Sequence, residues 1–139
     1  MDKDVLIKII GLQVVGDEDD EIEVLTKGQH YFKNDQHYIL YDEYEEETEE
    51  KIKNVIKFNA NRAEVSREGF ISAKLEFEKG KMNQTLYATP LGDILMEIKT
   101  KEIKLKEKDD NINLKIDYEL YADSEKLSDS EIEIDINEV

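Results

Sequence analysis

Apolar residues alternate with polar ones along most of this chain, and this two-residue period restricts its fold more than any other feature. The clearest run places Ile112, Leu114, Ile116, Tyr118 and Leu120 at every second position. Successive side chains of a β-strand point to opposite faces of the sheet, so such a run predicts a strand with one buried face. Similar runs recur between short turns, which predicts about nine or ten strands and leaves no room for crossover helices.

Two tight turns set the pairing of these runs. Thr89-Pro90-Leu91-Gly92 holds the single proline of the chain. Proline fixes φ near about −65° at the second turn position, and a glycine two residues later can take a positive φ. This spacing predicts a hairpin corner between strands that pass through Tyr87 and Ile94. Asn34-Asp35 predicts a second hairpin with a two-residue turn, because both residue types tolerate positive φ.

Several further local features are predicted from the parity of the apolar residues. The parity changes by one residue at Gly11 and near Lys101, which predicts a β-bulge at each position. Met82, Gln84 and Leu86 have the parity expected for the apolar face of their strand. Residues 17–20, Asp-Glu-Asp-Asp, predict an acidic turn without the ligand spacing of a calcium loop.

The resulting fold class is all-β, an antiparallel meander closed into a calycin- or lipocalin-like β-barrel. Closure into a barrel removes the exposed edges that a long meander otherwise leaves. One apolar and one charged face per strand fit such a barrel. A two-sheet sandwich is the alternative. Residues 1–139 are expected to form a single domain.

Composition limits the functions that the chain can have. Its 35 acidic and 19 basic residues give a formal net charge of −16. A field of this sign repels phosphate groups, so neither nucleic acid nor a membrane surface is an expected partner. Cysteine is absent, which excludes thiolate chemistry and disulfides. With neither a signal sequence nor a membrane helix in view, we expect a cytoplasmic protein, either a monomer or a weak homodimer.

A family resemblance follows from motifs that keep their order along nearly the whole chain. They are Thr26-Lys27-Gly28-Gln29-His30-Tyr31-Phe32-Lys33, Tyr38-Ile39-Leu40-Tyr41-Asp42-Glu43, Arg67-Glu68-Gly69, Phe77-Glu78-Lys79-Gly80, Tyr87-Ala88-Thr89-Pro90-Leu91-Gly92, Lys99-Thr100 and Ile116-Asp117-Tyr118-Glu119-Leu120. Together they resemble the YwiB-like family, a bacterial domain family without an assigned activity. The resemblance implies a calycin-like barrel. The Gly-x-Trp signature of true lipocalins is absent, because the chain has no tryptophan.

The two histidines, His30 and His37, are candidate site residues. In the predicted hairpin Phe32 lies opposite His37 and His30 opposite Ile39, so the two imidazoles are diagonal neighbours with Cα atoms about 7–8 Å apart. Two imidazoles at that distance could share a metal if a carboxylate joined them. The simpler interpretation is a pair of half-buried polar residues satisfied by hydrogen bonds. No metal or other cofactor is predicted.

Arg67 shares a face with Ala63 and Val65, so its guanidinium should point into the barrel. A buried guanidinium requires an anion. That anion is either a protein carboxylate at one end of the barrel or the head group of a ligand. The remaining candidates for contacts with a ligand are Gln84, Tyr87, Thr100 and Tyr41.

We therefore expect a barrel that binds a small, partly apolar or anionic ligand. The alternative is a protein-interaction module with a filled interior that uses Tyr31, Tyr38 and Leu40 on the outer wall. Enzymatic activity is not expected, since the sequence pairs no nucleophile with a base.

Overall fold

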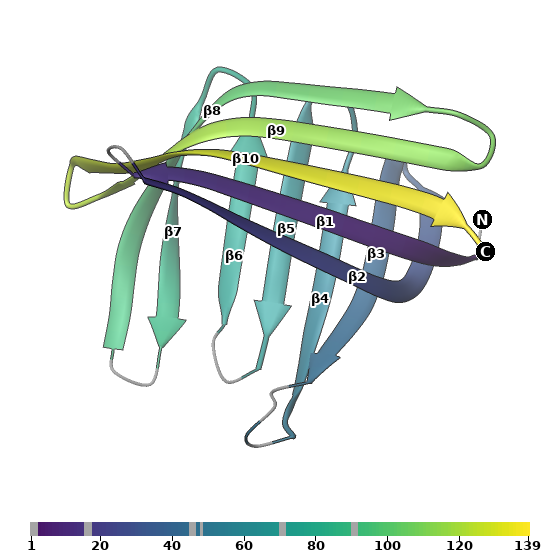
Figure 1. Ribbon diagram of the computed structural model, residues 1–139. Coiled ribbons are helices and arrows are strands. Elements are labelled where there is room, and N and C mark those ends of the chain that lie inside the picture. The colour runs from purple at the N-terminus through teal and green to yellow at the C-terminus, as the bar shows by residue number, and fades with distance from the viewer. Residues whose placement is uncertain (1–2, 16–17, 45–46, 48, 70–71, 90–91) are drawn as a thin grey trace.

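The structure, a computed structural model, describes residues 3–15, 18–44, 47, 49–69, 72–89 and 92–139. This part of the chain contains ten strands and no helix (Figure 1). The strands are β1 (Lys3–Val15), β2 (Glu18–Lys33), β3 (Gln36–Tyr44), β4 (Lys51–Phe58), β5 (Arg62–Glu68), β6 (Ala73–Glu78), β7 (Met82–Thr89), β8 (Gly92–Glu107), β9 (Asn111–Ala122) and β10 (Glu125–Glu138).

All ten strands form one antiparallel sheet in the order β6-β5-β4-β3-β2-β1-β10-β9-β8-β7. Each ladder joins strands that are consecutive in the chain, except the ladder between β1 and β10. Figure 1 shows the sheet curling round on itself, with β1, β2, β9 and β10 crossing in front of the strands from β3 to β6. The predicted meander and its β-barrel are thus confirmed.

The barrel closes between β6 and β7, the two ends of the sheet, without a backbone ladder among the described residues. Side chains of β7 bridge the gap instead. Asn83 Nδ2 donates to the carbonyl oxygen of Glu76 at 3.3 Å, and Thr85 Oγ1 donates to that of Lys74. These bonds satisfy carbonyl groups that an open edge would expose. The barrel is therefore nearly closed, with a seam sealed by side chains.

This seam explains why the predicted parity of β7 was wrong. Met82 is 49 % exposed and Leu86 is 56 % exposed, and Gln84 between them is exposed as well. The inward positions are held by Asn83 and by Thr85, which is buried. Polar side chains are needed on that side because they supply the donors that seal the seam.

Apolar side chains fill the middle of the barrel. Phe58 and Phe77 are the largest of the fully buried ones. The core also includes Val5, Ile7, Ile39, Ile56, Ile98, Leu114, Ile116, Ile134 and Ile136. All of them come from the inward-facing positions of their strands, as the alternation predicts.

The predicted bulge near Lys101 is confirmed by a register shift between Thr100 and Glu102. The bulge predicted at Gly11 is wrong, because Gly11 stays in register opposite Ile22 on β2 and Ile132 on β10. The apolar residues after Gly11 simply lie on the other face of a regular strand. The predicted acidic turn is also wrong for residues 18–20, which continue the ladder of β2 with β1. Such errors arise because a pattern along one strand does not show the ladders on either side of it.

Positive φ angles support the predicted turns. Asn34 and Asp35 have φ of 53° and 59°, as a two-residue hairpin of the predicted kind requires. Gly92 has φ of 128° and pairs with Thr89 across the predicted corner. Pro90 and Leu91 themselves lie outside the described residues.

Gly28 occupies the position where the sheet has no room for a side chain. A Cβ atom there would lie 2.4 Å from the carbonyl oxygen of Leu40 and 2.6 Å from Cδ1 of Ile7. Ladder pairing with β3 also begins at Gln29, directly after this glycine. Gly28 is therefore the residue that lets β2 pass close to β3.

We expect Gly28→Ala to lower the free energy of unfolding by about 1–3 kcal/mol, since the added methyl group must displace backbone. Gly11→Ala is the matched control, because nothing lies within 4 Å of a Cβ at that position. Urea denaturation of both variants measures the difference. Equal midpoints for the two variants would contradict this account.

Candidate functional site

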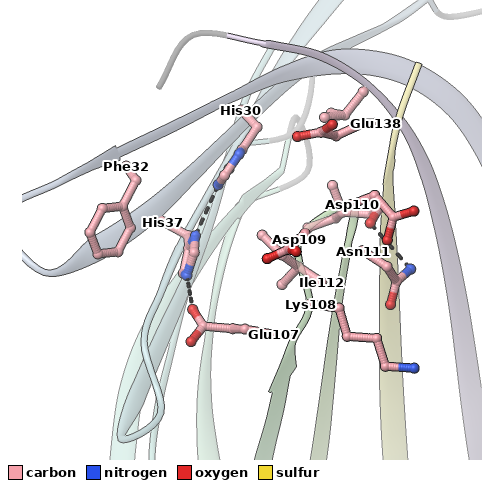
Figure 2. A pocket seen from close by; sticks show the side chains of 12 residues that line it. His30, Phe32, His37, Glu107, Lys108, Asp109, Asp110, Asn111, Ile112 and Glu138 are labelled. Atoms are coloured by element: carbon pink, nitrogen blue, oxygen red, sulfur yellow. Dashed lines mark hydrogen bonds and ion pairs between the residues drawn. The ribbon is translucent and has the colours of Figure 1, made fainter.

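A pocket of about 420 Å³ opens at one end of the barrel, beside the turn between β2 and β3 and the turn between β8 and β9 (Figure 2). We call it the mouth pocket. It is lined by Val5, His30, Phe32, His37, Glu107, Lys108, Asp109, Asp110, Asn111, Ile112, Ile136 and Glu138. Both histidines of the chain therefore contribute to one cavity.

The β2–β3 hairpin brings the two histidines together in the predicted register. His30 pairs with Ile39, and Phe32 pairs with His37. The imidazoles are buried, with 6 % and 7 % exposure, and Nε2 of His30 lies 2.9 Å from Nδ1 of His37. The His37 ring is further packed between Phe32 and Phe58, at ring-centre distances of 4.8 and 5.0 Å. The rings are consequently held in fixed orientations.

A third member, Glu107, extends this pair into a chain of hydrogen bonds. Its Oε1 atom contacts Nε2 of His37 from the end of β8. A carboxylate only accepts, so Nε2 of His37 must donate. In the uncharged pair Nδ1 of His37 then accepts from Nε2 of His30, which leaves Nδ1 of His30 as an acceptor. One proton added at Nδ1 of His30 would make that atom a donor and leave the bond between the imidazoles unchanged.

Burial lowers the pKa of His30 below its ordinary value of 6.5, and the neighbouring His37 lowers it further. Lys3 acts in the same direction, whereas the Glu138 carboxylate opposes it. Desolvation disfavours the charged imidazolium. The lowered pKa therefore favours uncharged His30, in which Nδ1 is an acceptor while Nε2 donates to His37.

Four of the side chains that line the pocket are carboxylates. Glu107, Asp109, Asp110 and Glu138 line it against a single lysine, Lys108. Figure 2 shows the His30 ring across the pocket from the Glu138 carboxylate. The rim is thus acidic. In the described part of the chain no group of three or more histidine and acidic side chains is placed to hold a metal ion.

Acidification should destabilise the fold through His30. The pKa of His30 is lower in the folded state, so the unfolded chain binds the proton more tightly. The contribution of uncharged His30 to the free energy of unfolding is complete above pH 6.5. It is lost as the pH falls through the pKa of His30 in the folded state. We expect wild-type protein to lose unfolding free energy relative to His30→Phe below pH 6.5. A constant difference between pH 8 and pH 5 in chemical denaturation would show that His30 does not titrate as described.

Arg67 belongs to a second polar cluster, which is half-buried on the inward face of the sheet at the Glu43 end of β3. Its guanidinium NH2 group lies 3.5 Å from Oε2 of Glu43. Nδ2 of Asn54 donates to Oε1 of the same carboxylate at 3.1 Å. His37 and Glu43 are six residues apart on one strand, so this cluster and the mouth pocket are separated by about 20 Å.

Arg67 is therefore paired with a protein carboxylate, one of the two alternatives that its inward position allows. Tyr41 lies on the same face, where burial raises its pKa to about 12 and Glu43 adds to the effect. Two buried atoms of the cluster, Arg67 Nε and Asn54 Oδ1, have no hydrogen-bond partner among the described residues. The cluster is thus an ion pair with some unused hydrogen-bonding capacity.

A double-mutant cycle of Arg67→Met with Glu43→Gln should give a coupling free energy of about 1 kcal/mol, because both side chains keep about a third of their exposure. Lys8→Met with Glu23→Gln is the control cycle, a fully outer pair at 3.6 Å. The coupling free energy of this control cycle should be only about 0.2–0.5 kcal/mol. Identical couplings in the two cycles would argue against the structural role of Arg67.

Thr100 and Gln84, two further predicted site residues, join neither cluster in the described part of the chain. Thr100 is buried at 1 % exposure beside Tyr118, its partner across the β8–β9 ladder. Gln84 is exposed and points away from the barrel interior. The side chain of Tyr87 lies outside the described residues.

Sequence reasoning did not identify Glu107, Glu43 or Asn54 as site residues. Glu107 is 70 positions from His37, and it stands among many equivalent acidic residues. Asn54 could have been noticed from the sequence, because it is a polar residue at an inward position between Ile52 and Ile56. Parity places Asn54 on the inward face, where the register of the β4–β5 ladder pairs it with Arg67.

The comparisons with known proteins agree with the fold. The crystal structure of the ywiB protein from Bacillus subtilis superposes with a TM-score of 0.87 at 18 % identity, over 99 % of this chain and 93 % of that one. This likeness shows a shared fold. No curated protein matches the sequence. No helix among the described residues is long and apolar enough to span a membrane. Residues 7–134 match the family model described as Domain of unknown function (DUF1934), and the chain belongs to that family.

Proposed function

We propose that this protein binds a small, partly apolar molecule in the mouth pocket. The observation that carries the proposal is the pocket itself. It offers about 420 Å³ at the end of a barrel whose middle is filled by side chains. Pockets of such volume, with an apolar lining and a few fixed polar groups, are typical of small-molecule sites.

The composition of the lining supports this role. Val5, Ile112 and Ile136 contribute apolar surface, and the His30–His37–Glu107 chain contributes polar atoms in fixed orientations. The residues that line the pocket include no serine, threonine or cysteine to act as a nucleophile beside the imidazoles. We accordingly propose that the pocket binds its ligand without a chemical step. We also propose that the protein acts in the bacterial cytoplasm.

Titration with 2-phenylethanol, a neutral probe with an aromatic body, tests the proposal. The chain has only two histidines, so their ring signals in NMR spectra report directly on the mouth pocket. We expect saturable shifts of both ring signals and of the Ile112 and Ile136 methyl signals. Native mass spectrometry of freshly purified protein provides a parallel search for a retained molecule.

Two tryptophan variants supply the control. Lys108→Trp places an indole at the rim of the pocket and should weaken binding of the probe. Lys106→Trp introduces the same side chain two residues earlier, at an exposed position that does not line the pocket. An absence of saturable shifts in the wild-type protein would refute the proposed function.

The outer wall of the β2–β3 hairpin provides a second candidate function, a protein-interaction surface. Tyr31, Phe32, Lys33, Tyr38 and Leu40 line a hollow of about 400 Å³ there. The ammonium groups of Lys33 and Lys57 lie 5.5 and 5.7 Å from the centre of the Tyr38 ring. These contacts favour an acidic or aromatic partner. Shifts confined to the tyrosine ring signals in the titration would favour this candidate.

A further inference from the structure

We infer that the mouth pocket selects a small, partly apolar amine, with its ammonium group held between Nδ1 of His30 and the Glu138 carboxylate. This inference rests on the proposed function and adds the chemical class of the ligand. It is carried by three features of the pocket: the direction of its hydrogen bonds, the charge of its rim and the position of its apolar surface.

The hydrogen bonds present an acceptor to the ligand. In the described part of the chain, the His30 ring is hydrogen-bonded only through Nε2, to His37. Glu107 fixes the direction of both bonds in the uncharged chain, so Nδ1 of His30 keeps its lone pair. His30 lines the pocket, so a ligand that donates a hydrogen bond can pair with this lone pair.

The negative charge of the rim favours a positively charged ligand. Glu107, Asp109, Asp110 and Glu138 outnumber Lys108 among the side chains of the lining. Lys3 contacts Glu138 and neutralises part of this charge, but an excess of carboxylates remains. Charged groups that converge on a recessed site raise the local concentration of the opposite charge. An anionic head group would meet repulsion at the rim and a lone pair at His30.

Apolar surface lies next to these polar groups. Val5 pairs with Glu138 across the β1–β10 ladder, so the two residues share the inward face of the sheet. Ile136 precedes Glu138 by two positions on β10, and Ile112 on β9 is the ladder partner of Ile136. A ligand whose ammonium group reaches His30 and Glu138 can therefore rest its body on aliphatic side chains. A polyamine would gain less, because it lacks an apolar body.

Three probes of matched shape test the inference: 2-phenylethylamine, 2-phenylethanol and 3-phenylpropanoate. They are titrated at pH 8 and followed by the histidine ring signals. A charge-assisted hydrogen bond should favour the amine over the alcohol by about tenfold in Kd. The carboxylate should bind at least tenfold more weakly than the alcohol, roughly the effect of one unfavourable charge contact.

Two variants locate the selectivity. His30→Phe keeps an aromatic ring in the hairpin but removes the acceptor, and Glu138→Gln removes the charge. Each should reduce the preference for the amine over the alcohol to about threefold or less, since one of two polar contacts remains. Glu133→Gln is the matched control. It lies on the same strand and loses the same charge, but its carboxylate pairs with Lys115 at 3.3 Å outside the pocket.

The outcomes separate the inference from the proposed function. Equal binding of the alcohol and the amine would overturn the choice of an amine and leave the pocket as a binding site. Tighter binding of 3-phenylpropanoate would also overturn it and would indicate that His30 presents a donor. Failure of all three probes to bind would refute both proposals. An amine preference that survives in both variants would place the ammonium group elsewhere and overturn the site described here.

Discussion

The ladder between β1 and β10 is the contact on which the rest of the structure depends. Every other ladder joins consecutive strands, so without this one the sheet would divide into a β1–β6 half and a β7–β10 half. The ladder runs from Val5 opposite Glu138 to Val14 opposite Asp129 and buries Ile7, Ile134 and Ile136. Long-range pairing of this kind forms only after a large loop closes, and its apolar contacts must offset that entropy.

The mouth pocket depends on the same ladder, because its two sides come from different halves of the chain. The histidines and Phe32 belong to the first half, whereas Glu107, Ile112 and Glu138 belong to the second. The contact of His37 with Glu107 adds a polar connection between these halves. Formation of the site is therefore coupled to closure of the barrel. The Arg67–Glu43 cluster differs, since all its members lie on β3, β4 and β5.

The features that the sequence predicted correctly are those decided by neighbours along the chain. The two-residue turn at Asn34-Asp35 determines the register of His30 and His37, and alternation determines that Arg67 points inward. The features that it did not predict depend on strands distant in sequence. Glu107 acts on His37 only through the closed barrel. The outward position of Gln84 follows from the bonds between β7 and β6 that seal the seam. Gly28 reveals its role only once Leu40 is packed against it.

The carboxylates at the pocket have a different role from those on the rest of the surface. Most carboxylates lie on outer faces, where water screens them and where they contribute to solubility. At the mouth, carboxylates converge on a recess that also contains a pair of imidazoles in defined orientations. There the same charges act together with the His30–His37–Glu107 chain. The Glu107 carboxylate fixes which atoms of the imidazoles donate, and burial, which lowers the pKa of His30, favours the uncharged form of that ring. The proposed preference for an amine therefore depends on a single proton, because one added at Nδ1 of His30 would turn that acceptor into a donor.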